Sequence, residues 1–90
     1  MYHTSAVYNT IYTINGNYTS RPIYESLNKA VIKWGAFKLG DFDQMAWIIM
    51  GGTSIRFVSF SVVNDPRLAK DWNYRNNEMQ LIDAPYLYLA

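Results

Sequence analysis

The sequence predicts an α+β fold: one helix packed on an antiparallel sheet of four to five strands, with residues 1–90 forming one domain. Three observations predict this fold. Residues 45–63 contain two apolar runs on either side of Gly51-Gly52-Thr53-Ser54, which is typical of a β-hairpin. Residues 19–35 carry apolar side chains at helical spacing. Half of all residues are hydrophobic, which indicates an apolar sheet with more apolar surface than a single copy readily buries.

The N-terminal segment predicts a strand from Ser5 to Ile14. β-branched and aromatic side chains are frequent there, as they are in strands. Asn15-Gly16-Asn17 follows and contains residues that tolerate positive φ angles, so we expect the chain to turn at this point.

The helix is expected to begin near Thr19-Ser20, which can cap its first turn, with Pro22 at a position where a missing N–H is harmless. Gly35 can end it in the left-handed conformation; alternatively the helix continues to Leu39 with Gly40 as its cap. Ile32 lies off the apolar stripe. That stripe consists of Ile23, Leu27, Ala30, Val31 and Trp34.

The central segment, Met45–Met50, lacks the alternation of polar and apolar residues that is typical of a strand with one solvent-exposed face. We therefore expect a strand that is covered on both faces. The competing interpretation is a helix from Phe42 to Met50, with Asp41 as its N-cap. A short strand over Ala36–Leu39 would precede it, and a further strand over Ile55–Val63 would follow.

The C-terminal third has weaker signals. We expect a helical turn within Pro66–Asp71 and a last strand within Glu78–Asp83, while residues 72–77 fit no single element. The tail, Tyr86–Leu89, alternates and is apolar. We expect it to dock on its own subunit or on a partner, because an exposed tail of this kind promotes aggregation.

Composition excludes several classes of function. The chain has no cysteine, so disulfides and thiolate zinc sites are excluded, which suits a cytosolic location. A net charge of +1 gives no strong field for DNA or an anionic membrane. No apolar run approaches the roughly 20 residues of a membrane-spanning helix, and no signal peptide is visible.

No motif in the sequence predicts catalysis. His3 is the only histidine and is expected at the surface, while Asp41 and Asp43 are expected to be solvated loop charges. Phosphate-loop, dinucleotide-binding and metalloprotease motifs are all missing. We therefore expect no enzyme, no metal and no cofactor. Gly51–Ser54 could form a phosphate-binding nest, but a hairpin turn explains it more simply.

The three tryptophans differ in their surroundings. Trp34 and Trp47 lie among apolar residues and are expected in the core. Trp72 lies in Lys70-Asp71-Trp72-Asn73-Tyr74-Arg75, where charged residues flank the aromatic ring. Both a ligand contact and a core anchor fit this pattern.

Two stretches together resemble a phage family, the type 2 Thoeris anti-defence proteins, which act as cyclic-nucleotide sponges. The first runs from Ile23-Tyr24-Glu25-Ser26-Leu27, through Lys38 and a Gly40/Phe42 loop, to Met45–Met50 and Gly52-Thr53-Ser54. The second is Leu68-Ala69-Lys70-Asp71-Trp72. In the family the first stretch opens with a helix and continues with a basic strand.

The resemblance implies a phage counter-defence protein in the host cytoplasm that binds a cyclic nucleotide immune signal without catalysis. Lys38 or Arg75 would meet phosphates, and Phe42 or Trp72 would stack a base. The full set of ligand-binding residues expected is Lys38, Asp41, Phe42, Trp72, Asn73 and Arg75.

We also expect a homo-oligomer, because one helix cannot cover both faces of an apolar sheet. Two other functions fit the sequence. One is an inhibitor that binds a host enzyme through an aromatic patch such as Trp72, Tyr74, Tyr86 and Tyr88. The other is a small virion structural protein.

Overall fold

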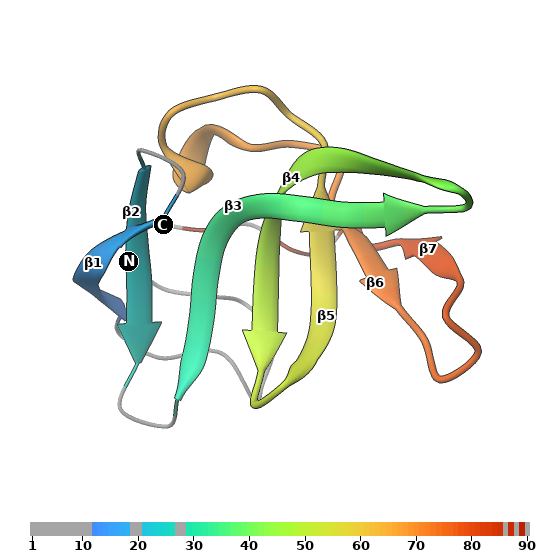
Figure 1. The fold of residues 1–90 in the computed structure, drawn as a ribbon, viewed down its shortest axis with the longest axis horizontal. Coiled ribbons are helices and arrows are strands. Elements are labelled where there is room, and N and C mark those ends of the chain that lie inside the picture. The colour runs from blue at the N-terminus through green and yellow to red at the C-terminus, as the bar shows by residue number, and fades with distance from the viewer. Residues whose placement is uncertain (1–11, 19–20, 27–28, 86, 88, 90) are drawn as a thin grey trace.

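The computed structural model describes residues 12–18, 21–26, 29–85, 87 and 89. They form a seven-stranded antiparallel sheet in which the strands follow one another in chain order (Figure 1). A single 3₁₀ turn, η1 (Pro66–Leu68), lies between the fifth and sixth strands. The strands are β1 (Tyr12–Tyr18), β2 (Arg21–Ser26), β3 (Ala30–Leu39), β4 (Phe42–Gly51), β5 (Ser54–Ser59), β6 (Asn73–Arg75) and β7 (Leu81–Asp83).

The predicted α+β fold is wrong, since the described residues contain no α-helix. The segment expected to be helical forms β2 and the first half of β3. Ile32, which did not fit the helical stripe, is fully buried and lies on the same face as Ala30 and Trp34. A period of two therefore describes residues 30–34 better than the helical period. The β-branched side chains of Val31 and Ile32 favour the strand as well.

The turn between β2 and β3 replaces the middle of the expected helix. The Ser26 hydroxyl accepts a hydrogen bond from the Ala30 amide at 3.1 Å, and Lys29 has a positive φ of 68°. Gly35, expected as a helix cap, lies inside β3 and pairs with Ala46 on β4. The short strand predicted for Ala36–Leu39 is the second half of β3, which bends strongly in Figure 1.

The central hairpin of the prediction is confirmed. β4 and β5 are joined by the two-residue turn Gly52-Thr53, and Gly52 has a φ of +62°, which glycine tolerates best. Residues 46–49 of β4 are all at most 1% exposed, so the strand is covered on both faces there as expected, whereas Met45 at the start of the predicted run is 37% exposed. The competing helix over 42–50 is excluded.

Two clusters of buried side chains lie on opposite faces of the sheet. The first cluster is centred on Trp34, Trp47 and Phe57, and the second on Ile48 and Val58. The second includes Phe37, whose ring packs edge-on against Phe60 with centroids 6.1 Å apart. Residues of β4 alternate between the two clusters.

The chain itself covers the first cluster, mainly with the segment between β5 and β6 and with the C-terminal tail. The Trp47 indole N–H donates to the Val63 carbonyl at 2.9 Å, and Arg21 on β2 donates to Asn64 at 3.3 Å. Leu87 and Leu89 are each 6% exposed and belong to the cluster, which confirms the docked tail for these two residues. Over the first cluster, the chain itself therefore supplies the cover that the sequence predicts from a second copy, and the homo-oligomer stays a prediction.

The remaining expectations have mixed outcomes. Most of the predicted strand Ser5–Ile14 lies outside the described residues, as do His3 and the side chains of Tyr86 and Tyr88. The turn expected at residues 15–17 is an irregularity within β1. The strand predicted for Ile55–Val63 ends at Ser59, while η1 and β7 confirm the helical turn and the last strand.

Candidate functional site

The structure does not bring the six predicted ligand residues together. Lys38, Asp41 and Phe42 lie at the β3–β4 hairpin turn, where all three are exposed and Phe42 is 61% exposed. Gly40 has a φ of +65° in this turn. Lys38 is opposite Asp43, so a cation and a carboxylate face each other at the end of the hairpin. None of these side chains lines either of the two cavities described below.

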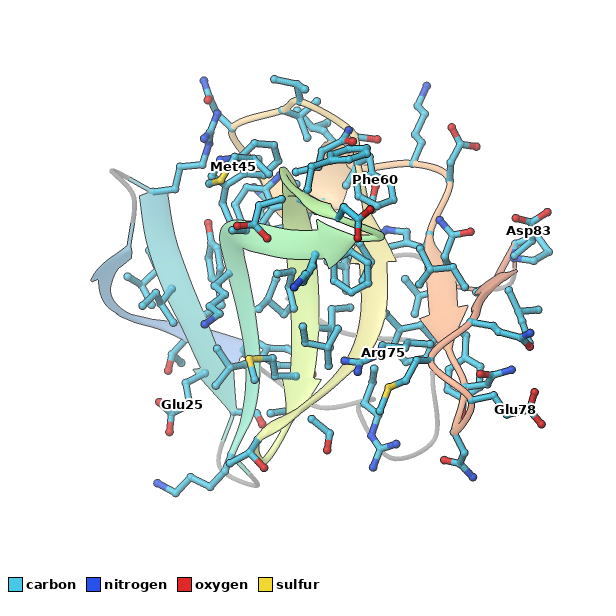
Figure 2. The ribbon with its side chains drawn as sticks, turned by 45° about the vertical axis from the view of Figure 1, so that its right-hand side comes forward. Glu25, Met45, Phe60, Arg75, Glu78 and Asp83 are labelled. Atoms are coloured by element: carbon cyan, nitrogen blue, oxygen red, sulfur yellow. The ribbon has the colours of Figure 1, made fainter. Side chains whose placement is uncertain are left out.

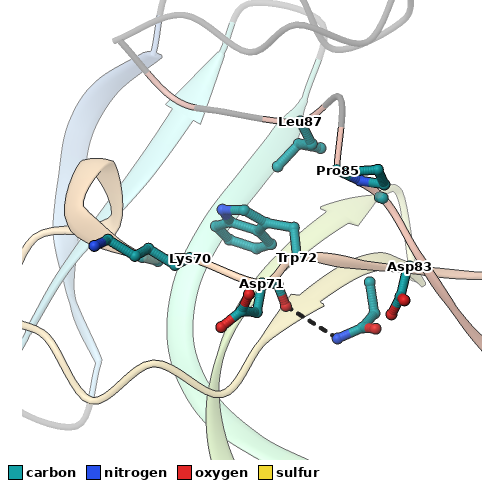
Figure 3. Close-up of a pocket in the computed structure, with 9 residues that line it drawn as sticks. Lys70, Asp71, Trp72, Asp83, Pro85 and Leu87 are labelled. Carbon is teal, nitrogen blue, oxygen red and sulfur yellow. Dashed lines mark hydrogen bonds between the residues drawn. The ribbon is translucent and has the colours of Figure 1, made fainter.

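Trp72 and Asn73 line the larger cavity, which has a volume of about 690 Å³ (Figure 3). Its walls are residues 69–73, residues 83–85 and Leu87. Trp72 is only 3% exposed and packs in the first cluster, which favours the core anchor over the base-stacking role. Its buried indole nitrogen has no hydrogen-bond partner among the described residues.

The charges around the larger cavity are mixed. Lys70 contributes one ammonium group, whereas Asp71 and Asp83 contribute two carboxylates. Asp71 is held in the left-handed conformation with a φ of 55°, and its carbonyl accepts a hydrogen bond from Asn73 at 3.1 Å. Two carboxylates at its rim make this cavity a poor site for phosphate, because like charges repel. It suits a neutral or cationic group better.

Arg75 lines a second cavity of about 430 Å³ on another part of the sheet. The walls of this cavity are residues 53–56, residues 75–77 and Met79. Among the residues that the structure describes, its lining includes two arginines, Arg56 and Arg75, and no aspartate or glutamate. Hydroxyl and amide side chains supply the rest of its polar surface, so its net charge is positive and its donors outnumber its acceptors.

Strand register places the two arginines together. β5 and β6 pair antiparallel with Phe57 opposite Tyr74 and Val58 opposite Asn73. Arg56 and Arg75 each directly adjoin the Phe57–Tyr74 pair that ends this ladder, and both residues line the same cavity. The β4–β5 pairing shifts register beside Arg56, between Ile49 and Met50. Such irregularities redirect side chains at the edge of a ladder.

The described residues contain no group of three or more histidine, aspartate or glutamate side chains that could hold a metal ion. The titrating groups with shifted pKa values line neither cavity. The hydrogen bond that Arg67 donates to Asp65 lowers the pKa of the Asp65 carboxyl and raises the pKa of the Arg67 guanidinium. Burial raises the pKa of the Tyr24 phenol, and the negative charge of Asp65 raises it further. The Asp65–Arg67 pair lies within the β5–β6 segment, which the Arg21–Asn64 hydrogen bond joins to β2.

Arg56 is the residue that sequence reasoning missed. It lies within a run of apolar residues, Ile55 to Val58, where a cation is unusual inside a strand. The sequence therefore shows that Arg56 is unusual. It does not show that Arg56 lies near Arg75, because β6 has only three residues and its register cannot be deduced from so short a run.

The fold and the two cavities define an all-antiparallel β protein with one mixed-charge cavity and one cationic cavity. The described part of the chain contains no helix of the length and hydropathy needed to cross a membrane. Comparison with protein-family models, with curated proteins and with solved structures yields no significant match.

Proposed function

We propose that this chain is a non-catalytic binding protein that sequesters a nucleotide ligand, and that the ligand is a cyclic nucleotide signal of a host defence countered by a phage. The ligand class comes from the sequence resemblance. The structural observation that supports phosphate binding is the cationic cavity around Arg56 and Arg75, whose described lining residues include no aspartate or glutamate.

The proposal differs from the sequence-based hypothesis in its residues. The stretch that matches a helix in the resembling family is strand β2 here, so the proposal does not depend on a shared fold. Trp72 is buried in the core and does not present a ring face to a base. Of the six predicted residues, Arg75 is the one that the proposal uses for phosphate, now together with Arg56.

Isothermal titration calorimetry with a panel of cyclic mono- and dinucleotides tests the function. The proposal predicts saturable heat with at least one member and recovery of the intact nucleotide after the protein is denatured. Hydrolysed product would contradict a sponge, and no heat from any member at high protein concentration would reject nucleotide sequestration.

Self-association is a separate part of the proposal. Since the chain covers the first cluster itself, a second copy would pack on the apolar side chains that remain exposed among the described residues. Sedimentation equilibrium decides this point, because a monomer has a mass of 10.5 kDa. Among the described residues, the large exposed apolar side chains are Ile14, Phe42, Met45, Val62, Leu68, Met79 and Ile82.

A second candidate function is inhibition of a host protein through the β3–β4 hairpin turn. The observation that favours it is the exposed ring of Phe42 between two exposed carboxylates, Asp41 and Asp43. An exposed aromatic on a protruding hairpin is a common anchor at protein interfaces. A pull-down from host lysate with the wild-type protein and with Phe42→Ala tests it: a stoichiometric protein lost in the variant supports inhibition.

A further inference from the structure

We propose that Arg56 and Arg75 form a binding site for a multiply charged oxyanion, namely a phosphate or pyrophosphate group. The inference deepens the proposed function, because it states where the phosphate of a nucleotide would be held. It does not require the rest of the ligand to be a nucleotide, so the two proposals can fail separately.

The first step is the cost of placing the two arginines together. They come from adjacent antiparallel strands and line the same cavity. Like charges opposite each other on neighbouring strands destabilise a sheet. An anion that bridges the two guanidinium groups converts this repulsion into two attractive contacts, so the free site is prepared for an anion.

The second step is that the described residues supply no counter-charge to the two arginines. The ion pairs of the described residues are Lys29 with Glu25 and Arg67 with Asp65, and neither includes a residue of this cavity. The contact shown for an Arg75 guanidinium nitrogen is with the Met79 sulfur, a weak acceptor. The nearest acidic residue in sequence, Glu78, points outward from the β6–β7 hairpin in Figure 2.

The third step is that the hairpin beside Arg75 is held rigidly. The Asn76 carboxamide oxygen accepts hydrogen bonds from the amides of Glu78 and Gln80, both at 2.9 Å. The backbone N–H of Asn76 donates to the backbone carbonyl of Gln80 at 3.0 Å, which is a further hydrogen bond across the loop. A fixed loop loses little conformational entropy when a ligand binds.

The fourth step is the match between the donors and an oxyanion. Each guanidinium has five N–H donors in a planar fork, a geometry that suits phosphate oxygens. The hydroxyls of Thr53 and Ser54 add donors at the cavity wall. Two fixed positive charges favour a multiply charged anion such as phosphate over a monoanion such as acetate or chloride.

The test compares the thermal stability of the wild-type protein in a few millimolar phosphate, pyrophosphate, acetate or chloride, at equal low ionic strength. A ligand that binds only the folded state raises the melting temperature. We expect a rise with phosphate and pyrophosphate and none with acetate or chloride. Equal shifts with all four salts would overturn the site, and this comparison needs no variant.

The variants are Arg56→Gln and Arg75→Gln, with Lys38→Gln as a control that removes an exposed cation outside the cavity. We expect each arginine variant to bind pyrophosphate about tenfold or more weakly, and the control to bind as the wild type does. Without added anion, each arginine variant should melt no lower than the wild type, because repulsion is relieved. Unchanged pyrophosphate affinity in both arginine variants would overturn the proposal.

Calorimetry separates this site from the proposed function. Pyrophosphate binding that needs both arginines, with no heat from any cyclic nucleotide, would keep the site and reject the sponge. Nucleotide binding that is equally tight in the wild type and both arginine variants would keep the function and reject this site.

Discussion

Trp34 on β3 and Trp47 on β4 form a cross-strand pair, with ring centroids 5.6 Å apart and ring planes inclined at 64°. Edge-to-face packing of this kind adds about 0.5–1.5 kcal/mol to the burial of the rings. Arg21 lies over the Trp34 ring at 4.3 Å from its centroid, so β2 is joined to the pair. The Trp47 indole donates to Val63, so the pair also holds the segment after β5.

Replacing Trp47 by alanine should therefore destabilise the protein severely. Trp47 is fully buried, and truncating a buried tryptophan typically costs about 3–5 kcal/mol. Urea denaturation followed by circular dichroism measures the change. Phe42→Ala serves as the control and should change stability by less than about 0.5 kcal/mol, because Phe42 is exposed. A similar small loss for Trp47→Ala would contradict the central role of the pair.

Ser59 should matter more than Ser61 for anchoring the segment between β5 and β6. Both hydroxyls donate to the Lys70 carbonyl, but Ser59 is fully buried and Ser61 is partly exposed. Ser59→Ala should cost about 1–3 kcal/mol, because it removes a fully buried hydroxyl that donates to the Lys70 carbonyl and accepts from the Ser61 amide. Ser61→Ala should cost less. Denaturation midpoints in the reverse order would show that the anchor is assigned to the wrong residue.

Stability should fall in acid partly through Asp65. Its pKa is lowered in the folded state by the hydrogen bond from Arg67, so this contribution is complete above the unfolded pKa of about 3.9. It is lost as the pH falls through the folded pKa. The gap in denaturation midpoint between the wild type and Arg67→Gln should thus be small at pH 7 and should narrow towards pH 2. A gap that widens in acid would contradict this assignment.

The turn between β4 and β5 should tolerate asparagine at position 52 better than valine. Gly52 has a positive φ, where a Cβ atom costs roughly 1–2 kcal/mol and a β-branched residue more. No neighbouring atom lies within 4 Å of the position of an added Cβ. The loss of stability in a variant therefore comes from the strained backbone conformation and not from a clash with other residues. Chemical denaturation of Gly52→Asn and Gly52→Val measures it. Equal stability of both variants would contradict a positive φ.

The sequence contains enough information to predict the central hairpin but not the strands around it. An unbroken apolar run next to a glycine turn has one economical explanation, and residues 46–49 are buried accordingly. The segment from Ile23 to Trp34 satisfied helical spacing by coincidence, because positions 30 and 34 share a face in both a helix and a strand. Only Ile32 and the β-branched content distinguished the two.

The cationic cavity was beyond sequence reasoning for a different reason. Arg56 and Arg75 are far apart in sequence and meet through the register of a three-residue strand. No local pattern encodes such a pairing, because long-range register depends on the whole sheet. The sequence predicts Arg75 as a phosphate contact, but it does not predict that Arg56 lines the same cavity.

The most direct test of the account is a nitrogen-detected magnetic resonance titration of the arginine side chains with pyrophosphate. The account predicts that the guanidinium Nε–H signals of Arg56 and Arg75 shift together along one binding curve. The Arg67 signal, paired with Asp65 outside the cavity, should stay in place. Signals of Arg56 and Arg75 that do not move, or that move no more than that of Arg67, would contradict it.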